Sequence, residues 1–434
     1  MLIRTLGLTA AALLLMSALA SGADQTRMGA GNDGALAIAE KSPLINSAMG
    51  FLRQAAEHIG DPKLKRETLD AFTKPNTCIA HRANLTGKDK AAILKALTDA
   101  GLLNSADGRE FPGGLQAGIF PPVSDDGTAC PHLPQRFDSA PGSVFGGHHS
   151  YPGGLAMHEA FNDLSSLSLA ADYRMAYGHP GATGLPTIDV SSDAVFVRRG
   201  DDLAIDQDLI IAAPIWHDWG KVMVFQWNAD GTEFQELNVG GNGASDNYGA
   251  KGDSRTPGHH ILGLAESMKR GLGPDLVITQ ASAHAAPTLG NEFKVVNWIR
   301  AAAIIARIDP VANGYLSRDA AGKLRLPELG ATESFNLHAA PTSPTAFLPE
   351  FTIHNLSDGN YYLAVPAAFD VGVILEKLAP EFGFDPNDRA RFNNKFRNPV
   401  LSYLSAERLM FLYARQGLAG VRAQVKQLRS RNLI

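Results

Sequence analysis

The stretch Leu209-Ile-Ile-Ala-Ala-Pro-Ile-Trp-His-Asp-Trp-Gly-Lys221 decides how the rest of the chain is interpreted. Its apolar run predicts a buried helix. Consecutive helical residues differ by about 100° around the axis, so His217 and Asp218 can line one cleft. Lys221 follows at a spacing that places it on the same side. An imidazole, a carboxylate and an ammonium at a buried helix end lose hydration free energy, and a bound metal ion is the simplest compensation.

Other segments rich in His, Gly and Asp flank this stretch. They are His148-His-Ser-Tyr-Pro-Gly-Gly-Leu-Ala-Met-His158 upstream, and Gly258-His-His-Ile-Leu-Gly263, Ser282-Ala-His284 and Ala306-Arg-Ile-Asp309 downstream. The ordered series H…HD…H…H…D, with the motifs HHxYxGGLxxH, HDxGK and GHxxxG, resembles the HD superfamily of metal-dependent phosphohydrolases over about residues 141–310. The resemblance implies a mainly α-helical fold, an HD-type helical bundle with additional N- and C-terminal helices.

The same resemblance implies a set of metal ligands. The first metal would be bound by His158, His217, Asp218 and Asp309, and Asp218 would bridge to a second metal held by His259 and His284. A surface position for Asp309, away from Asp218, would remove the basis for the family assignment. The family often has a second His where this chain has Ala283, which predicts either fewer ligands at the second site or a lower metal occupancy there. Imidazole and carboxylate ligands suit Fe, Mn, Zn or Ni, one or two ions in all.

Three residues are expected to take part in catalysis. Asp218 would bridge two cations that activate a water molecule, and Lys221 would hold a phosphate oxygen as a point charge. His149 would border the substrate pocket by the same resemblance, although His148 and His149 could equally be exposed loop residues. The family members that degrade RNA carry an additional nucleic-acid module, and residues 24–140 do not have its pattern.

Composition and charge describe a globular protein. The chain has 434 residues, of which 45% are hydrophobic and 19% charged, so it can bury a full core and form one large domain or two. A formal charge of −5 gives no basic field for nucleic acid or for an anionic membrane. We expect a small phosphorylated substrate, no nucleic-acid partner and no stable membrane anchor.

Residues 1–23 have the pattern of a secretory signal peptide. Arg4 precedes the apolar run Leu6–Leu19, and Ala18-Leu-Ala20 matches a cleavage site. A membrane anchor is the alternative, but the apolar run is short for crossing a bilayer. The sequence therefore predicts export to the periplasm or the medium.

Export bears on the only two cysteines, Cys78 and Cys130. An even pair in an oxidising compartment favours a disulfide, and closing a loop of about fifty residues would contribute about 4 kcal/mol in the chain-entropy model. Two buried free thiols are the alternative. Neither cysteine lies near the His and Asp series in sequence, so thiolate metal ligands are not expected.

The predicted organisation has four parts. They are the signal peptide 1–23, an N-terminal helical and loop region 24–140, the HD-type metal-binding domain 141–325 and a C-terminal helical extension 326–434. Apolar spacing predicts helices over 43–59, 64–72, 89–103, 153–177, 206–218, 258–271, 274–285, 291–308, 366–381, 387–395 and 398–430. No residue with identifiable chemistry stands out in 330–434, which is expected to pack as an appendage.

Several connecting segments have patterns of their own. Residues 24–40 predict a flexible start, and residues 104–150 predict a long ordered loop around the core. Residues 178–200 predict an insertion. Alternating residues around Asp230-Gly231 predict a β-hairpin inserted in the helical domain. The Gly-rich segment 240–257 lacks the motif of a phosphate-binding loop and is either a mobile lid or a plain connection.

Three functions fit these patterns. The first is an exported metal-dependent phosphohydrolase acting on a small phosphoester such as a nucleotide. The second is a di-iron oxygenase, because a minority of the superfamily resembling inositol oxygenase uses the same ligand series. The third is a non-catalytic metal-containing binding protein, against which the complete ligand set and Lys221 argue. Fold alone does not choose among them, and the identity of the bound metal would separate them best.

Overall fold

The computed structural model describes residues 28–178, 185, 203–243, 253–288, 290–329 and 348–434. The described residues are mainly α-helical, which confirms the predicted fold class. The predicted signal peptide, nearly all of the insertion 178–200 and the middle of the Gly-rich segment lie outside the described residues. Within them, no helix has both the length and the apolar character needed to cross a membrane.

The N-terminal region packs as short capped helices. They are α1 (Asn32–Ala39), α2 (Pro43–Glu57), α3 (Pro62–Thr73), η1 (Ala80–Arg82), α4 (Gly87–Asp99), η2 (Ser105–Arg109) and α5 (Gly114–Ile119). Side chains of Ser42 and Asp61 accept hydrogen bonds from the first turns of α2 and α3. The segment between α5 and α6 is a long ordered loop, as predicted for most of 104–150.

The expectation of a flexible start over residues 24–40 is wrong for residues 32–39, which form α1. Asn32 ties this helix to the core, because its side chain donates to the Pro134 carbonyl and accepts from the Trp227 backbone N–H. Ala35 and Ala39 of this helix are buried on the side that faces the core. Small residues that suggest flexibility in a sequence can therefore also permit close packing.

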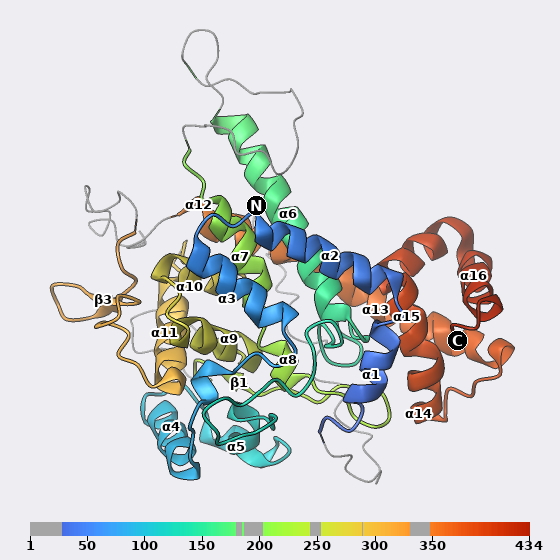
Figure 1. The fold of residues 1–434 in the computed structure, drawn as a ribbon, viewed down its shortest axis with the longest axis horizontal. Helices are drawn as coiled ribbons and strands as arrows, with labels where there is room; N and C mark the ends of the chain where they lie inside the picture. Colours follow the sequence, from blue (N-terminus) through green and yellow to red (C-terminus); the bar gives the residue numbers. More distant parts are fainter. Residues whose placement is uncertain (1–27, 179–184, 186–202, 244–252, 289, 330–347) are drawn as a thin grey trace, which may run out of the picture.

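The middle of the chain supplies the helices that carry the predicted motifs. They are α6 (Gly154–Tyr177), α7 (Gln207–His217), α8 (Lys221–Val224), α9 (Gly258–Lys269), α10 (Pro274–Ala281) and α11 (Glu292–Ala306). Every residue of α7 except Asp208 is buried, as expected for a helix that is apolar on all sides. It lies in the centre of Figure 1 and contacts α3, α6, α9, α10 and α12.

The predicted β-hairpin around Asp230-Gly231 is present only as a tight turn. The Asn228 N–H donates to the Thr232 carbonyl, and Trp227 forms a single bridge with Glu233. The two short sheets join β1 (Asn238–Val239) to β2 (Thr256–Pro257) and β3 (Ser317–Arg318) to β4 (Leu324–Arg325).

The C-terminal region is not only the appendage that was predicted, because part of it packs inside the rest of the protein. It contains α12 (Pro349–Ser357), η5 (Asp358–Asn360), α13 (Tyr361–Leu378), η6 (Ala379–Phe382), α14 (Arg389–Phe392), the π-turn η7 (Asn393–Arg397), α15 (Asn398–Leu404) and α16 (Ala406–Ser430). Helix α12 packs against α6, α7 and α10, in the middle of the domain. Helices α13–α16 gather at the right of Figure 1.

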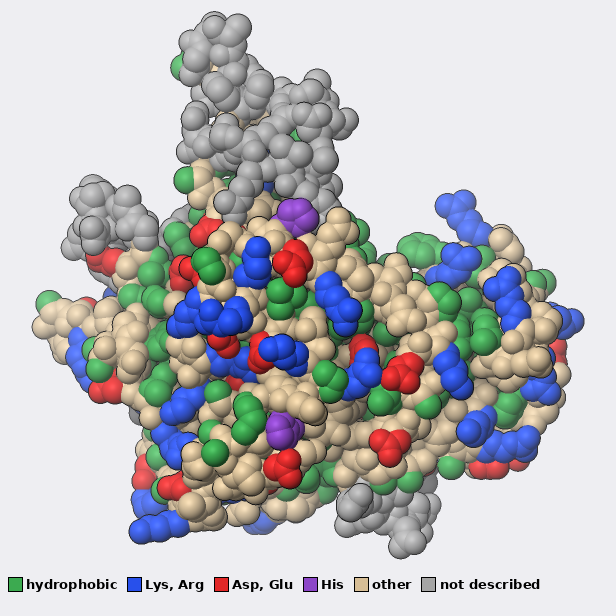
Figure 2. Space-filling view, in the orientation of Figure 1, with side chains coloured by type: hydrophobic (Ala, Val, Ile, Leu, Met, Phe, Trp, Pro, Cys, Tyr) green, Lys and Arg blue, Asp and Glu red, His purple; other side chains and the backbone are tan. Residues whose placement is uncertain are grey.

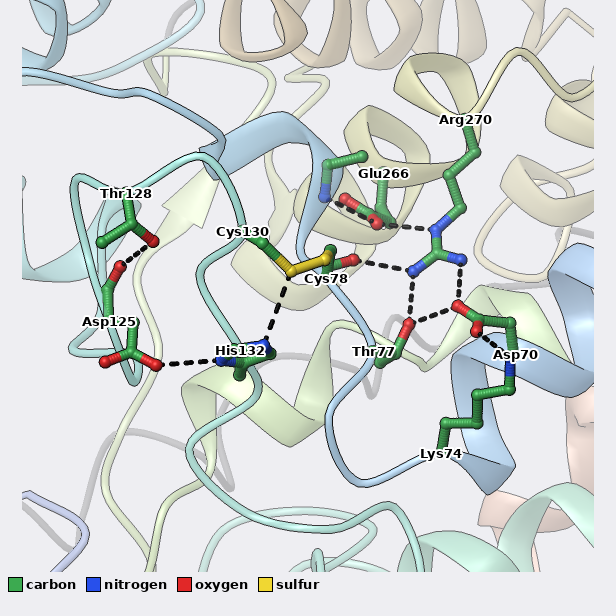
Figure 3. Close-up of a disulfide and its surroundings, with 11 residues drawn as sticks. Asp70, Lys74, Thr77, Cys78, Asp125, Thr128, Cys130, His132, Glu266 and Arg270 are labelled. Carbon is green, nitrogen blue, oxygen red and sulfur yellow. Dashed lines mark hydrogen bonds and ion pairs between the residues drawn. A yellow bond between two sulfur atoms is a disulfide. The ribbon is translucent and has the colours of Figure 1, made fainter.

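The predicted Cys78–Cys130 disulfide is confirmed, with Cα atoms 5.0 Å apart. Figure 3 shows that it lies beside a second cross-link centred on Arg270, the residue that follows α9. The Arg270 guanidinium donates to the carbonyl of Cys78 and to the carboxylates of Asp70 and Glu266. Covalent and ionic links thus hold the N-terminal loops onto the end of α9.

Side chains of both charge signs are interspersed on the face drawn in Figure 2, and histidine is rare there. Most of the histidines that the structure describes are in the interior: His81, His149, His158, His217, His259, His260 and His354 are all buried. Ionisable imidazoles seldom gather in a core unless they have partners or ligands, so the interior contains the candidate site.

Candidate metal centre

Asp218 is the centre of the site. It follows the last residue of α7 and is 1% exposed. Its Oδ2 atom lies 3.1 Å from Nε2 of His158 and 3.4 Å from Nε2 of His217, and its Oδ1 atom lies 2.9 Å from Nε2 of His259. The two oxygens of one carboxylate therefore face two different sets of imidazole nitrogens.

The first set is completed by an aspartate that was not predicted. Oδ1 of Asp358, on η5, lies 3.1 Å from Nε2 of His158 and 3.4 Å from Nε2 of His217. Helices α6 and α7 supply the two imidazoles, and the Asp358 carboxylate comes from the C-terminal region. Two imidazoles and two carboxylates thus converge, which is a donor set that divalent transition metals prefer.

The second set consists of Asp218, His259 and His284. One ligand atom from each lies within 4.8 Å of those of the other two. His259 comes from the first turn of α9, and His284 follows α10. This set has one carboxylate and two imidazoles, one carboxylate fewer than the first set.

Asp309 is wrong as a metal ligand. The predicted helix over 291–308 ends earlier, at Ala306, because Arg307 has a left-handed backbone with φ of 57°. The chain then turns away, and the exposed Asp309 accepts hydrogen bonds from the backbone N–H groups of Val311 and Ala312. Its carboxylate caps a surface turn, and Asp358 occupies the place expected for it.

The metal-facing imidazoles are oriented through their other nitrogen. Nδ1 of His217 donates to the Pro214 carbonyl at 2.8 Å, and Nδ1 of His259 lies 2.7 Å from Oε2 of Glu236. Nδ1 of His284 lies 3.2 Å from the Thr256 hydroxyl. A partner on the remote nitrogen fixes the tautomer that leaves a lone pair for a metal, and such partners accompany histidine ligands in most metal sites.

The electrostatics of the cluster favour a cation. Burial opposes charge on His158, but close contacts with Asp218 and Asp358 outweigh it and raise the pKa of His158 to about 9. The pKa values of His217 and His259 are also raised against the effect of burial by nearby carboxylates. The two aspartates therefore attract positive charge, which protons supply when no metal ion does.

The lack of hydrogen bonds to the donor atoms also fits a metal site. Both carboxylate oxygens of Asp218, Nε2 of His217 and Nε2 of His259 are buried without a hydrogen bond of acceptable geometry in the structure. Buried polar atoms are nearly always paired, and leaving one unpaired costs about 1–3 kcal/mol. These atoms contact one another and Lys221 only as ion pairs without hydrogen-bond geometry, as expected where a ligand completes the site.

Lys221, Asp218 and His149, the predicted catalytic residues, all lie at this cluster. The Lys221 side chain is 3% exposed, and its Nζ contacts Oδ2 of Asp218. His149 packs against His158 with ring centroids 5.3 Å apart. Burial lowers the pKa of His149 to about 4, despite the nearby Glu407, so this imidazole is neutral at pH 7.

Besides Asp358, sequence reasoning missed four side chains that contact the cluster: Glu159, Glu236, His354 and Glu407. His354 contacts the His217 ring edge-on at 5.0 Å, and burial lowers its pKa well below the usual range. The available signal was the pair His354 and Asp358, four residues apart at a helix end. His260, adjacent to His259, packs between His284 and Trp298, and both of its ring nitrogens are buried without a hydrogen bond.

Comparisons with models of protein families, with curated proteins and with solved structures found no match. The comparisons therefore do not test the HD superfamily assignment, and with Asp309 in a surface turn the motif series that suggested it is incomplete.

Proposed function

We propose that the protein is a metal-dependent hydrolase that cleaves a small phosphoester such as a nucleotide. The position of Asp218 carries this proposal, because its two oxygens face two separate sets of imidazoles. A carboxylate in that position is suited to bridge two cations. The predicted motif series ended at Asp309, which lies outside the site, so the proposal depends on the cluster itself and no longer on the complete family pattern.

The residues that would hold the metals follow from the two sets. His158, His217, Asp218 and Asp358 would hold the first ion, and Asp218, His259 and His284 the second. Paired divalent ions of this kind supply Lewis acidity and an activated water for displacement at phosphorus. Glu236 and the Pro214 carbonyl would keep His259 and His217 in the metal-binding orientation.

The charge balance supports an anionic substrate. Asp218, Asp358 and Glu236 carry three negative charges, and burial raises the pKa of Glu159 well above its usual range. Two divalent cations would bring four positive charges, and the Lys221 ammonium is buried beside them. An excess of positive charge in a site of low dielectric attracts an anion such as a phosphoester strongly. A neutral polyol, the kind of substrate expected for an inositol oxygenase-like enzyme, would leave that charge unbalanced.

Lys221 would contact the phosphoryl group. Its ammonium contacts the same Asp218 oxygen that faces His158 and His217, so it lies at the edge of the first set. A cation held there can stabilise charge that develops on the phosphoryl oxygens during displacement. Because the lysine is on α8, a single short helix positions the contact relative to Asp218.

The test combines metal analysis with hydrolysis assays. The purified protein is analysed for bound metals and assayed with nitrophenyl phosphate esters and a panel of nucleotides. Lys221→Met should leave the metal content unchanged and lower kcat/KM. The activation free energy calculated from kcat/KM should rise by about 2–4 kcal/mol, the range for losing a charged contact in a site that excludes water. Asp218→Ala should remove the metals and the activity together.

Lys90→Met is the matched control, since Lys90 is also a partly buried lysine paired with an aspartate, Asp126, but lies away from the cluster. It should leave kcat/KM unchanged. A wild-type protein that carries two irons, consumes O₂ with a polyol or phosphonate and hydrolyses no phosphoester would replace the hydrolase with an oxygenase.

A further inference from the structure

A second group of histidines adjoins the proposed metal centre. His148 and His149 precede α6, and a ring nitrogen of each lies within 4.8 Å of one from His158. The ring centroid of His158 is 4.6 Å from that of His148 and 5.3 Å from that of His149. None of the roles proposed above uses His148, and His149 was expected only to border the substrate.

The two neighbouring imidazoles present their Nδ1 atoms to each other at 3.4 Å. One Nδ1 can donate to the other when it carries the ring proton, and when neither is protonated the two nitrogens at this separation can bind one cation from adjacent directions. His158 contributes a further observation. Its Nε2 atom faces Asp218 and Asp358, and its Nδ1 atom is buried with no hydrogen-bond partner in the structure.

His149 also has the remote carboxylate partner seen for the ligand His259. Nε2 of His149 lies 3.2 Å from Oε1 of Glu407, as Nδ1 of His259 lies 2.7 Å from Glu236. Glu407 is the only acidic residue of α16, whose other charged residues are Arg408, Arg415, Arg422, Lys426 and Arg429. The single carboxylate of a basic helix is directed at this imidazole, and its Oε1 is buried without a hydrogen bond.

The backbone around His149 is closely packed, which fixes the position of the His149 side chain. His149 has a left-handed φ of 53°, which is costly for a non-glycine residue. A Cβ atom at Gly154 would come within 1.8 Å of the His149 carbonyl oxygen, and one at Gly142 within 2.7 Å of the His149 Cβ. Two glycines and a strained backbone together set the direction of one side chain, as is common at binding sites.

From this geometry we propose that His148 and His149, with a ring nitrogen of His158, bind a third metal ion, and that Glu407 orients His149. With the first ion also bound, His158 would bridge the two ions as an imidazolate, its last ring proton having been released to solvent. Imidazole donors without thiolate favour a borderline cation such as Zn²⁺, Ni²⁺ or Fe²⁺. The site depends on the proposed metal centre only through the shared His158, and it does not require that the protein be a hydrolase. It gives the C-terminal helix α16 a direct part in metal binding.

The test counts metal ions on the full chain. The protein is stripped with a chelator, reconstituted with Zn²⁺ alone and analysed after removal of unbound metal. Wild type should hold three ions per chain, and His148→Ala and His149→Asn should each hold two. Asn is chosen at position 149 because it tolerates left-handed backbone better than Ala. His132→Ala, which removes a half-buried histidine paired with Asp125 outside the cluster, should still hold three.

Glu407→Gln keeps the size of the side chain and provides a second measurement if the histidine variants fold poorly. It should weaken the third binding event 10- to 100-fold in competition with a chromophoric chelator, and leave the first two unchanged. Two ions in both wild type and His149→Asn would overturn the third site and leave the proposed function standing. If wild type held two ions and His149→Asn only one, His148 and His149 would belong to one of the two sites already proposed, and the third site would be wrong. A wild type that binds no metal would overturn both proposals.

Discussion

The two ends of α9 carry two buried charged clusters that differ in how well they are satisfied. At the C-terminal end, the Glu266 carboxylate is fully buried and accepts hydrogen bonds from the backbone N–H groups of Ala80 and His81, from the His81 ring and from Arg270. At the N-terminal end, His259 faces Asp218, whose two oxygens have no hydrogen bond in the structure.

The pKa values of the two clusters show the same contrast. Burial alone would raise the pKa of Glu266, but His81 and Arg270 outweigh burial and lower it to about 2. Around Asp218, the positive charge that balances the carboxylates comes from histidines with raised pKa values and from Lys221. The Glu266 carboxylate therefore has its full complement of protein partners, while the carboxylates around Asp218 are balanced by protons when no metal is bound.

This difference separates a structural cluster from a binding site without reference to any motif. Both clusters are buried and rich in charge, so burial alone would not distinguish them. A cluster that hydrogen-bonds all its acceptors stabilises the fold and has no capacity for a ligand. A cluster whose lone pairs face one another retains that capacity, and the predictions below test this contrast from the largest effect to the smallest.

The largest effect is expected from Asp358→Asn. The change keeps the shape of the side chain but removes one of the two carboxylates that face His158 and His217. Affinity for the first metal should fall at least about 100-fold, since even groups that only orient a ligand are worth 10- to 100-fold. Metal titration checks this, and hydrolysis should be lost with the metal. Unchanged affinity would leave Asp358 as a mere neighbour of the site.

Removal of the disulfide should have the next largest effect, and this effect concerns the cluster around Glu266 and Arg270. Replacing both Cys78 and Cys130 by Ser opens a link that spans 52 residues, and should lower the free energy of unfolding by about 4 kcal/mol in the chain-entropy model. Chemical denaturation of the metal-free proteins measures this difference. Metal content should be unchanged, because the bridge packs against the Arg270 end of α9. Loss of metal with unchanged stability would reverse these roles.

Glu266→Gln should destabilise the fold by about 3 kcal/mol at neutral pH, from the lowered pKa of this carboxyl. The folded pKa of about 2 lies below the usual 4.5, so the stabilisation is present above pH 4.5 and is lost as the pH falls toward 2. The unfolding free energies of variant and wild type should therefore converge over that interval in urea titrations at a series of pH values.

Glu67→Gln is the control for Glu266→Gln, because Glu67 contacts the same Arg270 at 3.3 Å but is more exposed. Its effect should be much smaller and should not depend on pH in the same way. Equal effects for the two variants would mean that burial of Glu266 contributes little.

The features that the sequence predicted are those determined locally. The run ending at Trp216 is apolar on all sides and can only be a core helix, and the spacing of His217, Asp218 and Lys221 follows from one helix end. His158, His259 and His284 were found because each lies in a recognisable motif. The cysteine pair was predicted from its compartment and its even number.

The features that were missed depend on contacts between distant segments. Asp358 reaches the site because α12 packs between α6, α7 and α10, and no pattern within residues 330–434 shows that packing. Glu407 comes from still further along the chain. Asp309 was misplaced because a single left-handed residue, Arg307, ends α11 early, and periodicity of apolar residues carries no information about such a backbone change.

The smallest effect is expected from Asp309→Asn, which is the counterpart of Asp358→Asn. Asp309 is exposed, and its Oδ1 atom accepts from the backbone N–H groups of Val311 and Ala312, which an Asn side chain can also do. Metal affinity and kcat/KM should therefore equal those of wild type, and the melting temperature should barely move. Measured beside Asp358→Asn in the same metal titration, the pair decides which aspartate serves the site. If Asp309→Asn lost metal and Asp358→Asn kept it, the predicted motif series would be right and the arrangement of η5 beside His158 and His217 would be wrong.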